Sequence, residues 1–124
     1  MIKFISTELA AKPLGHYSQA TVHNGTIYVA TQLGIVPGKP IVVGSIQEQT
    51  EAALNNIREI LKAAGSDLDK VLRVTVYVAD IQFWDEVNAV YIQFFGKHKP
   101  ARGVIPCKTL HKGFQVAFDV IAAV

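Results

Sequence analysis

Residues 45–65 read SIQEQTEAALNNIREILKAAG and predict a long amphipathic helix over residues 46–64. Ser45 is followed three positions later by Glu48, which is the capping-box pattern found at the start of helices. Gly65 supplies the left-handed position at which such a helix ends. Apolar residues recur between these two ends at the helical period and form one stripe: Ala53, Leu54, Ile57, Ile60, Leu61 and Ala64.

A strand and a second helix are predicted downstream. Residues 71–79 alternate as a half-buried strand does, and a helix over residues 83–95 is expected to begin near Asp80 and to end at Gly96. The alternation places Leu72, Val74, Val76 and Val78 on one face and Arg73, Thr75 and Tyr77 on the other. The buried side of the second helix is expected to carry Trp84, Val87, Val90, Tyr91 and Phe94.

The remaining segments predict strands. Asn24-Gly25 between residues 20–23 and 26–32 is a strong hairpin signal. Residues 103–109 and 115–123 are two further strands, and residues 3–6 a short additional one. The order β-β-α-β-α-β-β predicts an α+β fold with two helices packed on one face of a mixed β-sheet, in a single domain spanning residues 1–124.

The second face of this sheet is predicted to be apolar as well. Ile27, Val29 and Thr31 alternate with Tyr28 and Ala30, and the last strand is largely apolar on both faces. A sheet with helices on one side and an apolar opposite face needs another cover, and a second copy of the chain provides one. The sequence therefore predicts an obligate homo-oligomer.

Composition narrows the class of protein. Twelve Lys and Arg against ten Asp and Glu give a net charge of +2, with the lysines spread along the chain, so a nucleic-acid partner is not expected. Cys107 is the single cysteine, which excludes an intramolecular disulfide and fits a reducing compartment. No secretory h-region and no membrane-spanning segment is apparent, so we expect a cytoplasmic protein without a membrane partner.

The common catalytic signatures are absent, and the four histidines match no metal spacing, so no metal is expected. Arg102 follows Pro100-Ala101 and lies at the start of a predicted strand. There its guanidinium either binds a carboxylate in a cleft or forms an ion pair at the surface. The residues alone favour the surface position. Asp119 in an apolar strand needs a partner if it is buried. Cys107 is interpreted as a small buried hydrophobe in the middle of its strand.

Several fragments, in this order and spacing, resemble the RidA/YjgF family of small trimeric enamine/imine deaminases. The fragments are GHYSQA (15–20), QEQT (47–50), NNI (55–57), AGSDL (64–68), VLRVTVYVAD (71–80), VNAVY (87–91), FF (94–95) and PAR (100–102). The resemblance covers essentially the whole chain. It implies a chorismate-mutase-like fold, a homotrimer with a barrel-like core, and three clefts between subunits.

The resemblance also implies roles for individual residues. Arg102 corresponds to the arginine that grips the carboxylate of a 2-imino or 2-enamino acid. Tyr17 corresponds to a tyrosine that lines the cleft, although His16 replaces the proline before it, and Asn88 matches the family's helix asparagine. The family's Ser-Gly-Gln segment reads Ala30-Thr31-Gln32 here, which leaves the Thr31 backbone N–H as a polar contact.

Two family residues are not matched. The family cysteine falls on Val104, and Cys107 lies three residues further on. The family glutamate that positions the attacking water falls on Ala117. Asp119 is two residues along the same strand, on the same face and about 7 Å away, so it is the candidate for water activation.

These departures leave more than one function open. The leading hypothesis is hydrolytic deamination of 2-imino/2-enamino acids to 2-keto acids and ammonia without a cofactor, with Arg102 and Asp119 catalytic and Tyr17, Thr31 and Asn88 binding substrate. The alternative is a non-catalytic binder or sensor of small carboxylates such as 2-keto acids, because Ala117 and Val104 replace the family glutamate and cysteine. RNA cleavage, a label attached to some relatives, ranks last because no basic patch is present.

Overall fold

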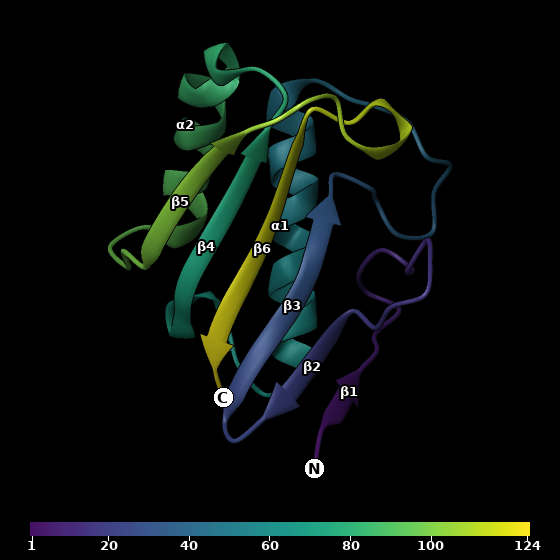
Figure 1. Cartoon of the computed structure of the whole chain (residues 1–124), viewed down its shortest axis with the longest axis vertical. Coiled ribbons are helices and arrows are strands. Elements are labelled where there is room, and N and C mark those ends of the chain that lie inside the picture. Colours follow the sequence, from purple (N-terminus) through teal and green to yellow (C-terminus); the bar gives the residue numbers. More distant parts are fainter.

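One mixed, six-stranded sheet organises the computed structural model, which describes all residues from Met1 to Val124 (Figure 1). The strands lie in the order β1-β2-β3-β6-β4-β5, and β4 and β5 run parallel while every other pair is antiparallel. The elements are β1 (Lys3–Ile5), β2 (Ala20–His23), β3 (Thr26–Leu33), α1 (Ile46–Ala63), β4 (Val71–Val78), α2 (Trp84–Phe95), β5 (Ala101–Pro106) and β6 (Val116–Ala123).

Both helices cover the same face of this sheet, as Figure 1 shows, and the opposite face is left open in the single chain. The core lies between the helices and the sheet, where Leu54 and Ile57 of α1 and Val74 and Phe118 of the sheet are fully buried. The fold is the predicted α+β class, with two helices on one face of a mixed sheet.

Helix α1 begins and ends where its sequence signals lie. The Ser45 hydroxyl accepts a hydrogen bond from the Glu48 backbone N–H at 3.1 Å, and the Glu48 carboxylate accepts one from the Ser45 N–H at 3.0 Å. These two bonds satisfy backbone donors that a helix start leaves unpaired. Gly65 adopts a φ of 82°, a conformation that disfavours a side chain and ends the helix.

Helix α2 is preceded by a short 3-10 turn, Ile81–Phe83. The Asp80 carboxylate accepts from the Gln82 N–H at 2.9 Å, so the predicted cap acts on this turn rather than on α2 itself. The helix ends at Gly96, as predicted. Val87, Val90, Tyr91 and Phe95 are its buried residues, whereas Trp84 and Phe94 are half-buried.

Two bulges move residues away from the faces that strict alternation predicts. In β3, Val29 pairs with Val120 and Gln32 with Phe118, so Ala30 and Thr31 lie opposite a single residue. One extra residue in a strand reverses its faces beyond that point, so Thr31 is exposed and Gln32 is buried. A similar irregularity between Val71 and Arg73 leaves Leu72 53% exposed instead of in the core.

The hairpin and the last strands differ little from prediction. Asn24 and Gly25 have φ values of 49° and 77°, as the two-residue hairpin turn requires. Strand β5 ends at Pro106, so the prediction of Cys107 within a strand is wrong. Cys107 follows the strand, is half-buried, and donates its N–H to the Val78 carbonyl at 2.8 Å. None of the helices is both long and apolar enough to cross a membrane.

Candidate functional site

Arg102 lies on the edge strand β5 and points toward α2. It is paired in parallel register with the buried Val74, so its side chain leaves the sheet on the helix side. One guanidinium nitrogen, Nη1, donates to the Asn88 amide oxygen at 2.9 Å. The guanidinium carbon is 4.6 Å from the ring centroid of Trp84 and 4.7 Å from that of Tyr91. This polar partner is a neutral amide, so the hydrogen bond leaves the positive charge of Arg102 uncompensated.

A cavity of about 520 Å³ lies beside this cluster. Its walls come from α2, from the segment after it and from the start of β5, and they contain three basic side chains and no acidic one. Burial raises the pKa of the Tyr91 phenol, and the nearby Arg102 charge partly opposes that shift. The lining residues are Asn88, Tyr91, Ile92, Phe95, Gly96, His98, Lys99, Pro100 and Arg102. The arrangement suits a small anionic ligand.

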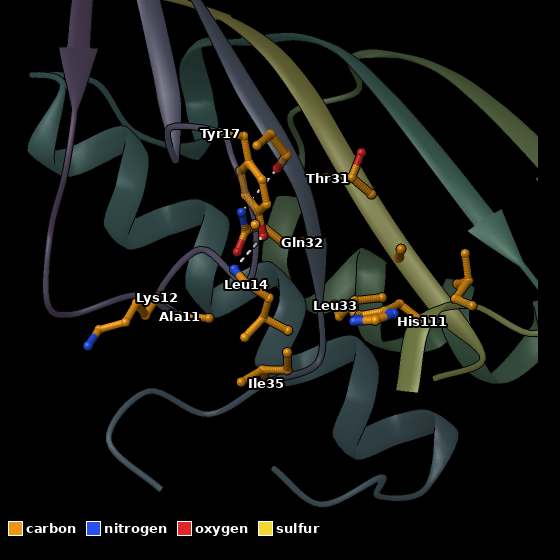
Figure 2. A pocket seen from close by; sticks show the side chains of 13 residues that line it. Ala11, Lys12, Leu14, Tyr17, Thr31, Gln32, Leu33, Ile35 and His111 are labelled. Carbon is orange, nitrogen blue, oxygen red and sulfur yellow. Dashed lines mark hydrogen bonds between the residues drawn. The ribbon is translucent and has the colours of Figure 1, made fainter. Parts of the chain in front are cut away.

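A second cavity, of about 510 Å³, lies between the N-terminal loop and β3. Figure 2 shows loop residues such as Lys12 and Leu14 along one side of it and His111 at the opposite side. Tyr17 and Thr31 line this cavity, as does Ala117. The complete lining is Ala11, Lys12, Leu14, Gly15, Tyr17, Ala30, Thr31, Gln32, Leu33, Ile35, Leu110, His111 and Ala117.

Tyr17 is held by its own loop, and the loop is held by two buried amides. The Tyr17 hydroxyl accepts from the Leu14 N–H at 3.2 Å (Figure 2). The Gln19 side chain donates to the carbonyls of Thr7 and Ala11 and accepts from the Thr7 N–H. Asn56 of α1 accepts from the Ala11 N–H at 3.2 Å and donates to the Ile35 carbonyl at 2.8 Å.

Gln19 and Asn56 were not among the sequence-predicted site residues, although they shape this cavity. A signal for Asn56 was present, because it lies three residues after Ala53 and four before Ile60, on the apolar stripe of α1. A polar residue on a buried stripe needs partners. Its partners, however, come from the loop and from the end of β3, which the sequence does not place.

Thr31 and Asp119 meet on the open face of the sheet. The Thr31 hydroxyl donates to the Asp119 carboxylate at 3.0 Å, and the bulge in β3 makes this contact possible by turning Thr31 to that face. Partial burial, together with the neighbouring Asp119 charge, raises the pKa of the Tyr77 phenol. Asp119 thus lies beside the hydroxyl groups of Thr31 and Tyr77, and its partner Thr31 lines the second cavity, as does Ala117 on the same face of β6.

The structure places the five predicted residues in two groups that do not meet within one chain. Arg102 and Asn88 form one group at the β5 edge, and Tyr17, Thr31 and Asp119 form the other around β3 and β6. Strands β5 and β3 are separated by β4 and β6, which is three inter-strand spacings or about 14 Å. Arg102 also lies on the helix face of the sheet, whereas Thr31 and Asp119 lie on the open face.

Comparisons with known proteins agree with this architecture. The family model described as Endoribonuclease L-PSP matches residues 7–124. A Bos taurus protein named 2-iminobutanoate/2-iminopropanoate deaminase is 44% identical over 121 residues, covering 97% of this chain and 88% of its own. A Yersinia pestis structure of the conserved Rid protein family superposes with a TM-score of 0.95 at 34% identity, over 100% of both chains.

A further comparison involves a structure with a bound amino acid. The structure of Escherichia coli TdcF with bound serine has a TM-score of 0.94 at 26% identity and covers 98% of each chain. The match to the bovine protein covers 97% of this chain, and the two structural matches cover 100% and 98% of it. The chain therefore belongs to the RidA/YjgF family, whose family model is described as Endoribonuclease L-PSP.

Proposed function

We propose that the protein is a homotrimeric deaminase that hydrolyses 2-imino and 2-enamino acids to 2-keto acids and ammonia in a cleft between subunits. The observation that carries this proposal is the uncompensated guanidinium of Arg102, held beside a cavity of about 520 Å³ that has no acidic side chain. The planar fork of an arginine matches both oxygens of a carboxylate. The deaminase name of the bovine relative and the serine in the TdcF structure favour the same ligand class.

The reaction needs a substrate held in a fixed orientation and one side chain that carries protons between water and the substrate. Arg102 binds the substrate carboxylate, and Asn88, Tyr17 and the Thr31 backbone N–H contact the rest of the ligand. Asp119 takes a proton from water as the oxygen attacks C2 and returns it to the nitrogen. Asp119 then takes the proton of the C2 hydroxyl and passes it to the amine nitrogen as the C–N bond of the carbinolamine breaks, so ammonia leaves and the C2 oxygen becomes the carbonyl of the keto acid. Fixing the carboxylate supplies much of the orientation, and a general base adds roughly 10²–10⁴-fold.

Assembly into a trimer would form the cleft in which this reaction takes place. The Arg102 group and the Tyr17 group lie at separated parts of one chain, and the open sheet face carries apolar side chains such as Tyr28 and Ile105, which are 49% and 46% exposed. Packing copies of the chain through this face covers it and brings the β5 edge of one subunit to the loop cavity of its neighbour. Each cleft then contains both groups.

The test generates 2-iminopropionate in situ and follows its decay. The wild type is expected to accelerate decay, and Arg102→Ala to reduce kcat/KM at least about a hundredfold, since charge-assisted carboxylate bonds are strong. Arg58→Ala, which removes another arginine that contacts an α2 aromatic ring outside both cavities, is the matched control. Equal decay with wild type, Arg102→Ala and buffer would remove the enzymatic proposal.

The second candidate is a carboxylate binder without turnover. It is favoured by Ala117, which lines the loop cavity where the family pattern has a glutamate. Pyruvate would then raise the melting temperature of the wild type, because a ligand that binds only the native state stabilises it, and Arg102→Ala would lose this shift. The absence of imine hydrolysis in the same sample distinguishes this binder from the deaminase.

A further inference from the structure

Three side chains of α2 surround the guanidinium of Arg102. Trp84 and Tyr91 are seven residues apart, so they project from the same face of the helix, with Cα atoms about 10.5 Å apart along the axis. Asn88 lies between them on that face. The guanidinium carbon is within 4.7 Å of both ring centroids, and Nη1 donates to the Asn88 oxygen. The guanidinium therefore occupies the gap between the two rings, above Asn88.

We propose that Trp84 and Tyr91 are positioning residues that form an aromatic clamp on Arg102 and hold its guanidinium ready to bind a carboxylate. This inference rests on the proposed function, in which Arg102 binds the substrate. The rings contact the guanidinium through their π faces, whereas a carboxylate binds to the in-plane N–H donors. The clamp and the ligand thus use different parts of the same group. One in-plane donor is occupied by Asn88, and the remaining donors stay available.

A flexible side chain at an exposed position explains why a clamp matters. Arg102 is exposed, and it lies on an edge strand that is paired on only one side, with β4. An arginine without neighbours in such a place samples many rotamers, and ordering them upon binding weakens affinity. Contacts that restrict Arg102 before the ligand arrives remove that cost. The benefit appears in substrate affinity rather than in the stability of the fold.

The two rings contribute through their faces and not through their polar atoms. Tyr91 is 6% exposed, and its hydroxyl is buried without a hydrogen-bond partner. Tyr91→Phe therefore keeps the clamp, while Tyr91→Leu removes one side of it. Likewise, Trp84→Phe retains a ring at the other side and Trp84→Leu does not. Trp84 is only half-buried, so replacing it disturbs the core less than replacing Tyr91.

A second arginine contacts an aromatic ring of α2, and this contact provides a matched control. The Arg58 guanidinium carbon lies 4.8 Å from the centroid of the Phe94 ring, which is the same type of contact at nearly the same distance. Phe94 is half-buried, like Trp84, and neither Phe94 nor Arg58 lines the cavity beside Arg102. Phe94→Leu therefore removes a cation–π contact of α2 without touching the clamp.

The first experiment measures the Kd of pyruvate by calorimetry and the KM and kcat for 2-iminopropionate. Trp84→Leu is expected to raise both Kd and KM by roughly three- to tenfold, with a smaller change in kcat. Trp84→Phe restores most of the affinity, and Phe94→Leu leaves it unchanged. In an Arg102→Lys background, which lacks the planar group, Trp84→Leu changes Kd less than twofold. An equal loss for Trp84→Leu and Phe94→Leu, or the same loss in both Arg102 backgrounds, overturns the clamp.

A second readout separates the clamp from the proposed function. The Nε–H signal of Arg102 in ¹⁵N NMR spectra is expected to show a ring-current shift that Trp84→Leu removes and Phe94→Leu does not. An unshifted signal in the wild type overturns the clamp whatever the activity. A wild type with the shifted signal that neither binds pyruvate nor hydrolyses the imine supports the clamp and overturns the proposed function.

Discussion

Asp119 is the acidic side chain on which the chemistry of the proposed site depends. We expect Asp119→Asn to lower kcat at least about a hundredfold, because the amide cannot accept a proton from water. The Asn oxygen still accepts the Thr31 hydroxyl, so the local structure is retained. Pyruvate affinity, which depends on Arg102, should not change. Steady-state kinetics with 2-iminopropionate and calorimetry with pyruvate measure the two quantities.

The same variant has a spectroscopic control. The Asp119 charge contributes to raising the pKa of Tyr77, so Asp119→Asn should lower that pKa without restoring it fully, since burial is the larger cause. Tyrosine ¹³C NMR over an alkaline titration measures the pKa of Tyr77. The control is Asp69→Asn, which removes an exposed carboxylate and should leave the Tyr77 pKa unaltered. Full activity of Asp119→Asn with a lowered Tyr77 pKa would show that the carboxylate is not the base.

Individual site residues were predictable from sequence to different degrees. The resemblance at Pro100-Ala101-Arg102 predicted a substrate-binding role for the arginine, whereas the residues alone favoured a surface role. Only the α2 contacts show how its guanidinium is held. The meeting of Thr31 with Asp119 depends on a bulge, and strict alternation places Thr31 on the opposite face. A one-residue insertion in a strand has no signal of its own here, because both faces of β3 carry mixed residues.

At the scale of elements, the signals at both ends of α1, at the end of α2 and at the hairpin turn were sufficient, whereas the cap predicted for the start of α2 acts on the turn before it. The helix ends at Ser45, Glu48 and Gly65 depend on bonds and backbone conformations within a few residues. A short stretch of sequence is therefore enough to predict them. The edges of strands depend on distant partners instead. Strand β5 ends at Pro106 because β4, its one neighbour, ends at Val78, to which Pro106 is paired. The sequence of residues 103–109 alone does not predict this pairing.

We predict that the capping box of α1 contributes to the free energy of unfolding. Ser45→Ala is expected to reduce the free energy of unfolding by about 1 kcal/mol, as for other helix caps, and Ser45→Asp to retain most of it. Urea denaturation at fixed protein concentration measures the change. The bonds from Ser45 lower the pKa of Glu48 below its ordinary value of 4.5.

The sign of the pH dependence follows from that shift. A carboxylate whose pKa is lower in the folded state stabilises the fold above its unfolded pKa, and this contribution disappears as the pH falls through the folded pKa. Glu48→Gln removes the titrating group, so the difference in unfolding free energy between wild type and Glu48→Gln should be largest above pH 4.5 and shrink in more acidic solution. A difference that grows on acidification would contradict the role of Glu48 in the box.

For the whole molecule, the open face of the sheet decides whether the site is complete. Ile121 is half-buried there and is paired with Tyr28 of β3. A lysine at position 121 has room in the isolated chain, because no helix covers this face, but in a trimer it would place a second positive charge beside Arg73, its partner in β4, within the interface. We therefore expect Ile121→Lys to fold and to remain monomeric. Light scattering should give the 13.5 kDa of one chain instead of three times that mass.

Loss of assembly should remove activity while the Arg102 group stays intact. In the monomer, Arg102 still contacts Asn88, so its Nε–H signal should keep the ring-current shift. Asp119 and Thr31, however, lie two and three strands away, about 10 and 14 Å across the sheet, and on its opposite face. Hydrolysis of 2-iminopropionate should fall to the level of Arg102→Ala. Ile81→Lys, at a position 54% exposed beside α2, is the control and should stay trimeric and active. A monomeric Ile121→Lys with full activity would show that one chain holds the complete site and that the cleft between subunits is not where the imine reacts.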